Sequence, residues 1–484
     1  MSRSLLTDLR KLRNILAVCL GALSLTLQTG CGKKDVIAPP YPTDSIGRIN
    51  RWIEDSMRRY YYWSDNIPGR PDYAQGSDAF FRSLLSSNDR FSWVSNGADI
   101  AAASNSYFIY GFHYAFVQVT DYNGLVGVVT SINSGGPADR AGFRRGSYFL
   151  AVNGQKVTAG NMEAVNRQLS EGASVRITSG AYTNNEWTTV SDTILYAGFR
   201  LENVVQHTRT FSSGGITTGY LYYSSFDEGW DTQLLQAVGK LKQAGIRELV
   251  LDLRYNAGGS VASSAKLACL VASALKGSET YAIYAGNHWE GKSGRSLQEV
   301  LNTSTNSAGR SFADLQPLKL PLNRVFILTT RATVSAAELV VNNLRPFLPV
   351  IQIGETTRGK NEAGFIIEDL RNPREVFWKM EPTVYKLFNK NNEGNYENGL
   401  TPQYPVSELA QLPLAGIGDA NDPLLRKALE IIYGSSQLPG NFIELGARHK
   451  SIINAVPVYR STDEQGNFSI MHCRRFDNNF LTNH

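Results

Sequence analysis

Cysteine and histidine are scarce in this chain, which has 484 residues, four cysteines and six histidines. Cys19 and Cys31 stand near its start, which leaves Cys269 and Cys473 for the rest. Two cysteines are too few for a disulfide framework, and the sequence leaves open whether they pair. The histidines are scattered, so a site that uses one would have to be assembled by folding.

A strong excess of one charge is absent too. The formal net charge is +5, and +3 of it comes from Arg3, Asp8, Arg10, Lys11 and Arg13. The remainder, near +2, does not indicate a nucleic-acid partner. An apolar share of 42% and a charged share of 19% are typical of globular protein, and the length predicts two to four domains. No internal repeat is evident.

The apolar run near the start is too short to cross a bilayer as a helix, because Ile15 to Leu27 spans only 13 residues. A basic start before this run and small residues after it predict an export signal over residues 1–30. Gln28-Thr29-Gly30-Cys31 resembles a bacterial lipoprotein box, with glutamine where an aliphatic residue is usual. The resemblance implies acyl chains on Cys31 that tether the protein to a membrane. Gly32 lacks the aspartate that often retains lipoproteins at an inner membrane, so we expect a cell-envelope protein at the outer membrane or facing the periplasm.

Residues 31–43, with three prolines, are predicted to be a tether, and residues 44–106 a small helical domain. Apolar residues recur at helical spacing over 46–60, and a second helix is predicted over 78–85. The aromatic cluster 60–63 favours core packing between these helices over a platform for sugar or peptide.

A β-rich module follows in residues 107–200. Val126 to Ile132 is predicted as a strand, and further short helices and strands follow it (138–141, 149–152, 162–169 and 174–178). The order of its turns resembles the signature of a PDZ domain: Gly136-Pro137-Ala138, Ala141-Gly142-Phe143, Gly146 and Val152-Asn153-Gly154. Ser147 departs from it, since an acidic residue is usual there.

The PDZ resemblance implies that this module captures a chain end by adding it as a strand. A glycine-containing loop would offer backbone N–H groups to the terminal carboxylate. Tyr110, Gly111 and Phe112 occupy the position of that loop.

Residues 201–433 alternate predicted strands and helices. Strands are predicted at 219–226 and 249–253, and helices at 234–244 and 260–275. The turn between the last two contains Gly258-Gly259, but neither G-x-G-x-x-G nor a Gly-Lys-Ser/Thr ending is present, so a nucleotide site is not indicated. The glycine pair could receive an oxyanion or simply allow a tight turn.

Later parts of the chain are less distinct. Residues 286–320 are polar, which predicts a long loop over the surface. One or two strands with a break at Pro382 are predicted over 376–388, and a helix over 422–432. Residues 434–484 are predicted to be a tail that docks on the rest.

A hydroxyl and an amine are predicted to meet at one sheet edge. Ser335 follows the buried strand 325–330 and opens a helix, and Lys360 follows the next strand, 350–353. On the local pattern alone, Ser335 and Glu338 fit a capping box, and Lys360 is a solvated surface lysine.

Five segments read together resemble the carboxyl-terminal processing (tail-specific) serine peptidases: 252–259, 335–338, 354–360, 399–402 and 422–429. With the PDZ-like module the resemblance covers residues 108–433, roughly two-thirds of the chain. It implies a multidomain α/β protein with a small helical N-terminal domain, a PDZ-like β module and a crotonase-like α/β core. It also implies a serine endopeptidase that cleaves exported proteins or peptides near their C-terminal ends, with no metal or other cofactor.

Under this resemblance Ser335 is the nucleophile and Lys360 its general base. A lysine accepts the serine proton only when it is neutral, so its pKa must be lowered by burial or by positive charge such as Arg358. The N–H of Ala336, with one from Gly258 or Gly259, would hold the oxyanion, and the helix start favours negative charge there.

One departure bears on activity. Family members commonly carry glutamine four residues after the lysine, where this chain has Gly364. Asn361 or Glu362 could substitute, although a carboxylate beside the lysine stabilises its charged form. The competing hypothesis is a catalytically silent peptide-binding lipoprotein of the same fold. The oligomeric state is not readable from the sequence.

Overall fold

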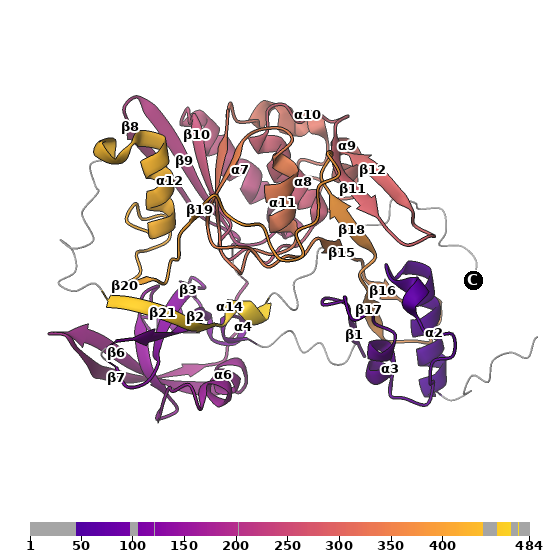
Figure 1. Cartoon of the computed structure of the whole chain (residues 1–484), viewed down its shortest axis with the longest axis horizontal. Coiled ribbons are helices and arrows are strands. Elements are labelled where there is room, and N and C mark those ends of the chain that lie inside the picture. The colour runs from indigo at the N-terminus through magenta and orange to yellow at the C-terminus, as the bar shows by residue number, and fades with distance from the viewer. Residues whose placement is uncertain are drawn as a thin grey trace, which may run out of the picture.

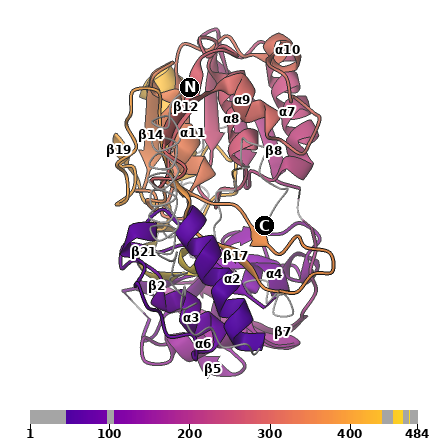
Figure 2. The same cartoon turned by 90° about the vertical axis from the view of Figure 1, so that its right-hand side faces the viewer.

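The computed structural model describes residues 45–96, 105–120, 122–201, 203–438, 453–465 and 473. The predicted export signal, the tether and Cys31 lie outside these residues. None of the helices within them is both long and apolar enough to span a membrane. Figures 1 and 2 show a large α/β core, with the PDZ-like module and the small helical unit both below it.

The N-terminal unit is helical, as its apolar spacing predicts. It contains α2 (Ser45–Tyr60), η1 (Ser64–Asn66) and α3 (Ser77–Ser83), and α2 and α3 contribute to one buried cluster. Tyr61 of the aromatic cluster is fully buried, and its hydroxyl accepts a hydrogen bond from the Ser86 N–H at 2.9 Å. These contacts confirm that the cluster is core packing.

A small sheet joins this unit to the core. β1 (Trp93–Ser95) pairs with β17 (Lys379–Glu381), which pairs in turn with β16 (Ile367–Glu368). The sheet brings the end of the N-terminal unit beside residues that follow Lys360 in the core.

The PDZ-like module is built on a sheet with the order β20-β21-β2-β3-β4-β6-β7. Its strands are β2 (Phe112–Val119), β3 (Val126–Ile132), β4 (Tyr148–Val152), β5 (Gln155–Lys156), β6 (Ser174–Thr183) and β7 (Glu186–Tyr196). Its helices are α4 (Ser106–Tyr110), α5 (Pro137–Arg140) and α6 (Met162–Ser170). The apolar strand β3 has the predicted bounds. β6 extends beyond the predicted strand 174–178, and β7 was not predicted, because most side chains of this hairpin are polar and show no apolar alternation.

The core contains a six-stranded sheet with the order β19-β14-β13-β10-β9-β8, parallel except for β8. Its strands are β8 (Val205–Ser213), β9 (Ile216–Tyr223), β10 (Glu248–Asp252), β13 (Val325–Thr329), β14 (Val350–Gly354) and β19 (Tyr404–Pro405). The helical elements are η2 (Glu228–Trp230), α7 (Asp231–Gln243), α8 (Val261–Val271), α11 (Ala336–Leu344), α12 (Pro423–Tyr433) and η4 (Ser435–Gln437).

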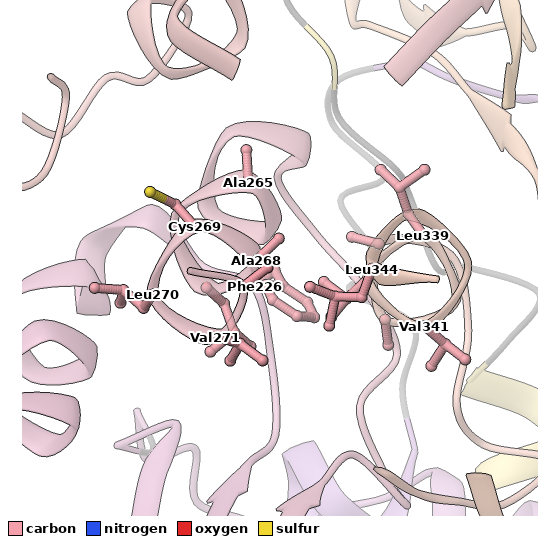
Figure 3. Close-up of a cluster of buried hydrophobic side chains, with 14 of the residues drawn as sticks. Phe226, Ala265, Ala268, Cys269, Leu270, Val271, Leu339, Val341 and Leu344 are labelled. Carbon is pink, nitrogen blue, oxygen red and sulfur yellow. The ribbon is translucent and has the colours of Figure 1, made fainter. Parts of the chain in front are cut away.

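Side chains of the central strands alternate between two buried layers. Leu249 and Leu251 join the layer of α7, α8 and α11, whereas Val250 joins the layer of α12. Buried parallel strands need cover on both faces, which these helices provide. Figure 3 shows Phe226 between the side chains of α8 and α11. The carboxyl ends of β10, β13 and β14 are thereby held at one edge of the sheet.

Residues 286–320 do not form the long surface loop that their polarity predicts. They contain β12 (Lys292–Ser296), α9 (Leu297–Asn302), α10 (Phe312–Leu315) and η3 (Gln316–Leu318). β12 belongs to a second sheet with β11 (Thr280–Ala285), β18 (Tyr385–Phe388) and β15 (Glu362–Ala363). The prediction is wrong because a few well-placed apolar residues, Leu297, Leu301 and Leu315, are enough to bury these short helices.

The tail docks, as predicted. β21 (Ile453–Arg460) lies between β20 (Gln411–Leu412) and β2 of the PDZ-like module, and α14 (Thr462–Gln465) follows it. Figure 1 shows this yellow strand along the top of the PDZ-like module, facing the core.

Candidate active site

Ser335 lies between β13 and α11 in a strained conformation. Its φ of 64° and ψ of −121° are rare for a non-glycine residue. Such a conformation costs about 1–3 kcal/mol, so the surrounding structure must hold the residue in it. The residue is fully buried, and no described group hydrogen-bonds its Oγ. Its backbone N–H donates to Glu338 Oε2 at 2.8 Å. Glu338 therefore caps the backbone of Ser335, and the hydroxyl is left for other chemistry.

The Gly258-Gly259 turn packs against Ser335. A Cβ on Gly258, whose φ is 100°, would lie 2.7 Å from Ser335 Cβ and 3.0 Å from Ala336 N. A Cβ on Gly259 would lie 2.3 Å from the backbone oxygen of Phe226. Glycine is thus needed at both positions by close backbone approach. The turn brings the three predicted oxyanion residues to one place.

The amide of Gly258 is already used within the turn. It donates to Asn256 Oδ1 at 2.8 Å, and Asn256 Nδ2 donates to the Tyr223 oxygen at 2.9 Å. This side chain holds the turn in place. Among the predicted oxyanion donors, the amides of Gly259 and Ala336 are therefore the better candidates.

The Glu338 carboxylate joins Ser335 to the loop that carries Lys360. Oε2 accepts from the N–H groups of Ser335 and Lys360, each at 2.8 Å. Oε1 accepts from Gly359 N at 2.6 Å and from Thr357 Oγ1 at 2.5 Å. Burial raises the pKa of this fully buried carboxyl to about 7, against the opposing effect of these hydrogen bonds. One side chain thus holds both predicted catalytic segments.

The Lys360 side chain is buried, and its Nζ lies 4.5 Å from the centre of the Phe91 ring. Burial lowers the pKa of this amine to about 8. The carboxylates of Glu381, Glu362 and Asp89 oppose that shift, because negative charge favours the protonated amine. Burial and the nearby acidic side chains therefore act on the pKa of this amine in opposite directions.

The arginines nearby anchor the Lys360 loop rather than tune the amine. Arg358, predicted to lower the pKa of Lys360, is not among the main causes of the shift. Its guanidinium donates to the backbone oxygen of Asp463 in the tail. Arg90 of the N-terminal unit donates to the backbone oxygens of Gly359 and Glu397.

Glu381 takes the place of the expected glutamine. A Cβ on Gly364 would lie 2.5 Å from the Pro382 oxygen and 3.3 Å from Glu381 Oε1, so a side chain at 364 does not fit. Glu381 is only 3% exposed. Burial raises its pKa to about 8, and Lys360 acts in the opposite direction. A carboxyl group from β17 thus fills the space into which residue 364 would project.

Of the two residues predicted to substitute for glutamine, Asn361 has other hydrogen-bond partners and Glu362 acts on Lys360 through its charge. The Asn361 side chain donates to the backbone oxygen of Gly394 and, at 3.3 Å, to Glu397 Oε1. Glu362 is in β15, paired with Lys386 of β18, and it favours the charged form of Lys360.

Comparison with known proteins identifies the region that carries this geometry. Residues 217–406 match the model of peptidase family S41. This region is an S41 peptidase domain. Residues 48–93 match the peptidase S41 N-terminal domain, and residues 128–179 match a PDZ domain. The α/β core, the PDZ domain and the helical N-terminal unit are therefore the parts of a multidomain S41 architecture.

The proteins to which this chain is similar include carboxyl-terminal processing peptidases. It is 25% identical over 250 residues to carboxyl-terminal-processing peptidase 3, chloroplastic, of Arabidopsis thaliana, covering 50% of this chain and 44% of that one. It is 24% identical over 299 residues to carboxy-terminal processing protease CtpA of Bacillus subtilis, covering 61% and 57%. The chain thus spans about half the length of these curated relatives.

A solved structure supports the S41 fold. A putative S41 protease from Bacteroides fragilis is 26% identical, with a TM-score of 0.64, over 79% of this chain and 97% of that one.

Two landmarks of the S41 domain form a buried ion cluster. Arg254 Nη1 and Nη2 donate to the Asp422 carboxylate at 2.6 and 2.8 Å, and Nη2 also donates to Asp252 Oδ2 at 2.7 Å. All three side chains are fully buried. This cluster ties the Gly258-Gly259 turn to the start of α12, so these residues position the site.

A cavity of about 700 Å³ opens beside Gly259 of the S41 domain. Its wall includes Phe226, Ser260, Phe365 and the tail residue Cys473. A space of this size accommodates side chains of an extended peptide next to the candidate oxyanion amides.

The predicted carboxylate loop of the PDZ domain lies where α4 meets β2. Gly111 has a φ of 83°, and its N–H donates to two carbonyls of the α4 helix at 3.0 Å. Tyr110 is fully buried, with its hydroxyl donating to the Gly172 oxygen at 3.1 Å, and Phe112 begins β2. Carboxylate capture by these three residues stays a prediction.

Sequence reasoning missed Phe91, Arg90 and Glu381. They come from the N-terminal unit and from β17, so no local pattern links them to Ser335. The one available signal was Gly364, because a glycine where the family has a larger side chain leaves space that another residue can fill.

In the described part of the chain, no acidic, histidine or cysteine cluster could hold a metal ion. None of the histidines there hydrogen-bonds Ser335 Oγ.

Proposed function

We propose that the chain is a serine endopeptidase that cleaves exported proteins or peptides near their C-terminal ends, with Ser335 as nucleophile and Lys360 as general base. The observation that supports this most is the Glu338 bridge between a strained, buried serine and a buried lysine. With a pKa of about 8, the lysine is neutral in a useful fraction near neutral pH. It can then accept the serine proton.

The geometry suggests the following order of events. Lys360 Nζ takes the proton as Ser335 Oγ attacks the scissile carbonyl carbon. The negative oxygen of the tetrahedral intermediate is bound by the N–H of Ala336 and that of Gly259, at the positive start of α11. Protonated Lys360 gives its proton to the leaving amine, and a water molecule later attacks the acyl-enzyme with Lys360 again as base.

The PDZ domain supplies substrate engagement in this proposal. Its β2 edge would receive a chain end as an added strand, with residues 110–112 at the carboxylate.

One observation favours the competing function, a catalytically silent peptide-binding protein of the same fold. Glu381 stands where an amide is common in the family, and its negative charge favours protonated Lys360. Peptide binding without turnover over the whole range from pH 6 to 10 would support that alternative.

The location is also a proposal. The sequence around Cys31 supports export and lipid attachment, which would place the protein in the cell envelope at the outer membrane or facing the periplasm. Palmitate labelling of the exported protein that disappears in Cys31→Ser supports this location, and persistent labelling contradicts it.

The peptidase assignment is tested by incubating protein that lacks residues 1–30 with an unfolded protein and mapping the products by mass spectrometry. We expect Ser335→Ala and Lys360→Ala each to abolish cleavage. A control is Ser296→Ala, because Ser296 also precedes a helix and its N–H also donates to the glutamate three residues on, Glu299, but it lies outside the site. Equal cleavage by wild type, Ser335→Ala and Lys360→Ala would overturn the assignment.

A further inference from the structure

The two sides of β2 in the PDZ domain are both occupied. β3 pairs with it on one side, and the tail strand β21 pairs with it on the other. The β21 register places Phe116 opposite Tyr459 and Val119 opposite Ala455. The edge on which a captured strand would be added is therefore already filled by this chain.

β21 also has the direction expected of a captured chain end. It is antiparallel to β2, and its C-terminal end lies at the start of β2, next to the predicted carboxylate loop. There the Ser461 N–H donates to the Tyr114 oxygen at 2.9 Å, and the Ser461 hydroxyl accepts from Tyr114 N at 3.0 Å. The chain then continues into α14 rather than ending at the loop.

One face of β21 packs against the PDZ domain and the other is exposed to solvent, as in a bound peptide. The Tyr459 ring packs against Tyr114 and Phe116, with centroid distances of 5.9 and 5.8 Å. Val456 and Val458 on the same strand are 66% and 46% exposed. Side-chain packing and main-chain pairing together are how an added strand is recognised.

The segment after β21 reaches the catalytic loop. Arg460 forms an ion pair with Glu355 at 2.8 Å, and Arg358 donates to the Asp463 oxygen. Further on, the Cys473 N–H donates to the Gly364 oxygen at 3.0 Å, in the wall of the cavity beside Gly259. The described residues that follow β21 thus contact the catalytic loop and the wall of this cavity.

We infer that β21 is the resident ligand of the PDZ domain, and that an external chain end of a substrate binds β2 only when β21 leaves. The inference rests on the peptide-binding role given to the PDZ domain under the proposed function. Because β21 belongs to the same chain, it competes at an effective concentration on the order of millimolar. The partner that this edge fits is therefore a strand with an apolar or aromatic residue at the Tyr459 position, and the tail keeps weak partners out.

The test measures binding, so it does not depend on peptidase activity. In the Ser335→Ala protein, a fluorescein-labelled peptide with the sequence of residues 453–461 and a free carboxylate is titrated by fluorescence anisotropy. We expect Tyr459→Asp, which puts a charge into the apolar contact, to tighten binding of this probe at least about tenfold by releasing β21. Val456→Asp makes the same change on the exposed face and should bind the probe as the parent does.

A reversible disulfide between β2 and β21 shows whether the Tyr459→Asp protein is still folded. Gln118 and Val456 are directly opposite each other in β2 and β21, and cysteines at opposed antiparallel positions are close enough for a disulfide. In Tyr459→Asp protein with Gln118→Cys and Val456→Cys, oxidation should remove probe binding and reduction should restore it. Equal probe affinity in the parent, Tyr459→Asp and oxidised proteins would overturn the inference, even if the protein proved to be an active peptidase.

Discussion

At the scale of single residues, the proposed mechanism depends on the pKa of Lys360, and Glu381 is the acidic residue that acts on it most strongly. Burial lowers the pKa of Lys360 to about 8 and raises that of Glu381, and the charge of each group opposes the shift of the other. Since neutral lysine is the proposed base, cleavage should rise with pH, reach half of its maximum near pH 8 and level off about one unit higher. The negative charge of Glu381 works against the base, whereas the family's glutamine would not.

Glu381→Gln should therefore move the rising limb of the pH–rate profile to lower pH. Ionised Glu381 favours protonated Lys360, so removing the carboxyl group lowers the pKa of Lys360 and makes a larger fraction of the lysine neutral at a given pH. A shift of one pH unit would raise kcat/KM about tenfold on the rising limb. Glu368→Gln, which removes a half-buried carboxylate on the neighbouring strand β16, is the control. An unchanged profile in Glu381→Gln, with a normal melting temperature, would show that Glu381 does not act through Lys360.

The sequence could predict that Ser335 and Lys360 lie at one sheet edge, because each follows a buried strand and parallel neighbouring strands end at the same edge. It could not predict Glu381, since the contact is made by a strand that pairs with the N-terminal unit. Nor could it separate the two roles of Glu338, which caps Ser335 and also binds the Lys360 loop. Such roles depend on long-range packing that no local pattern encodes.

At the scale of elements, the Gly258-Gly259 turn and the start of α11 fit together without spare room. Gly258→Ala places a methyl group 2.7 Å from Ser335 Cβ, so the serine or the turn must move. Displacement by about 1 Å at a reacting group costs on the order of 100-fold in rate. We expect a loss of that size in kcat/KM.

A matched control separates this clash from backbone strain. Gly142 has a φ of 92°, near the 100° of Gly258, but a Cβ there has nothing within 4 Å. Gly142→Ala should therefore keep wild-type kcat/KM while carrying a similar strain. Equal activity of the two variants would contradict the close fit of turn and serine.

Elements with strong periodicity were predictable from sequence, and those without it were not. The buried runs of β3, β13 and β14 and the amphipathic spacing of α2 and α12 predicted these elements nearly to their ends. The polar hairpin of β6 and β7 and the short helices α9 and α10 have few apolar residues. They form because neighbouring elements supply the packing.

At the scale of the whole molecule, a buried arginine fastens the PDZ domain to the S41 domain. Arg145 Nη1 donates to Tyr255 Oη at 2.9 Å, and Nη2 lies 2.9 Å from Glu408 and 3.4 Å from Asp422. Its side chain is 6% exposed. The tail strand β21 adds a second junction, since it pairs with β20 and with β2.

Arg145→Met should destabilise the protein by about 3–5 kcal/mol, because it leaves buried carboxylates short of a partner. Urea unfolding measures the change. Arg144→Met is the control, since Arg144 is 64% exposed and its ion pair with Asp139 is worth little. If both variants unfold at the same urea concentration, Arg145 does not hold the two domains together.

The central claim is that Lys360 activates Ser335, and covalent labelling tests it most directly. A fluorophosphonate probe reacts with an activated serine, and tryptic mapping by mass spectrometry locates the adduct. The account predicts one adduct, on the peptide that contains Ser335, formed faster as the pH rises to about 8 and lost in Lys360→Ala. An adduct on another residue, or equal labelling rates in wild type and Lys360→Ala, would contradict it.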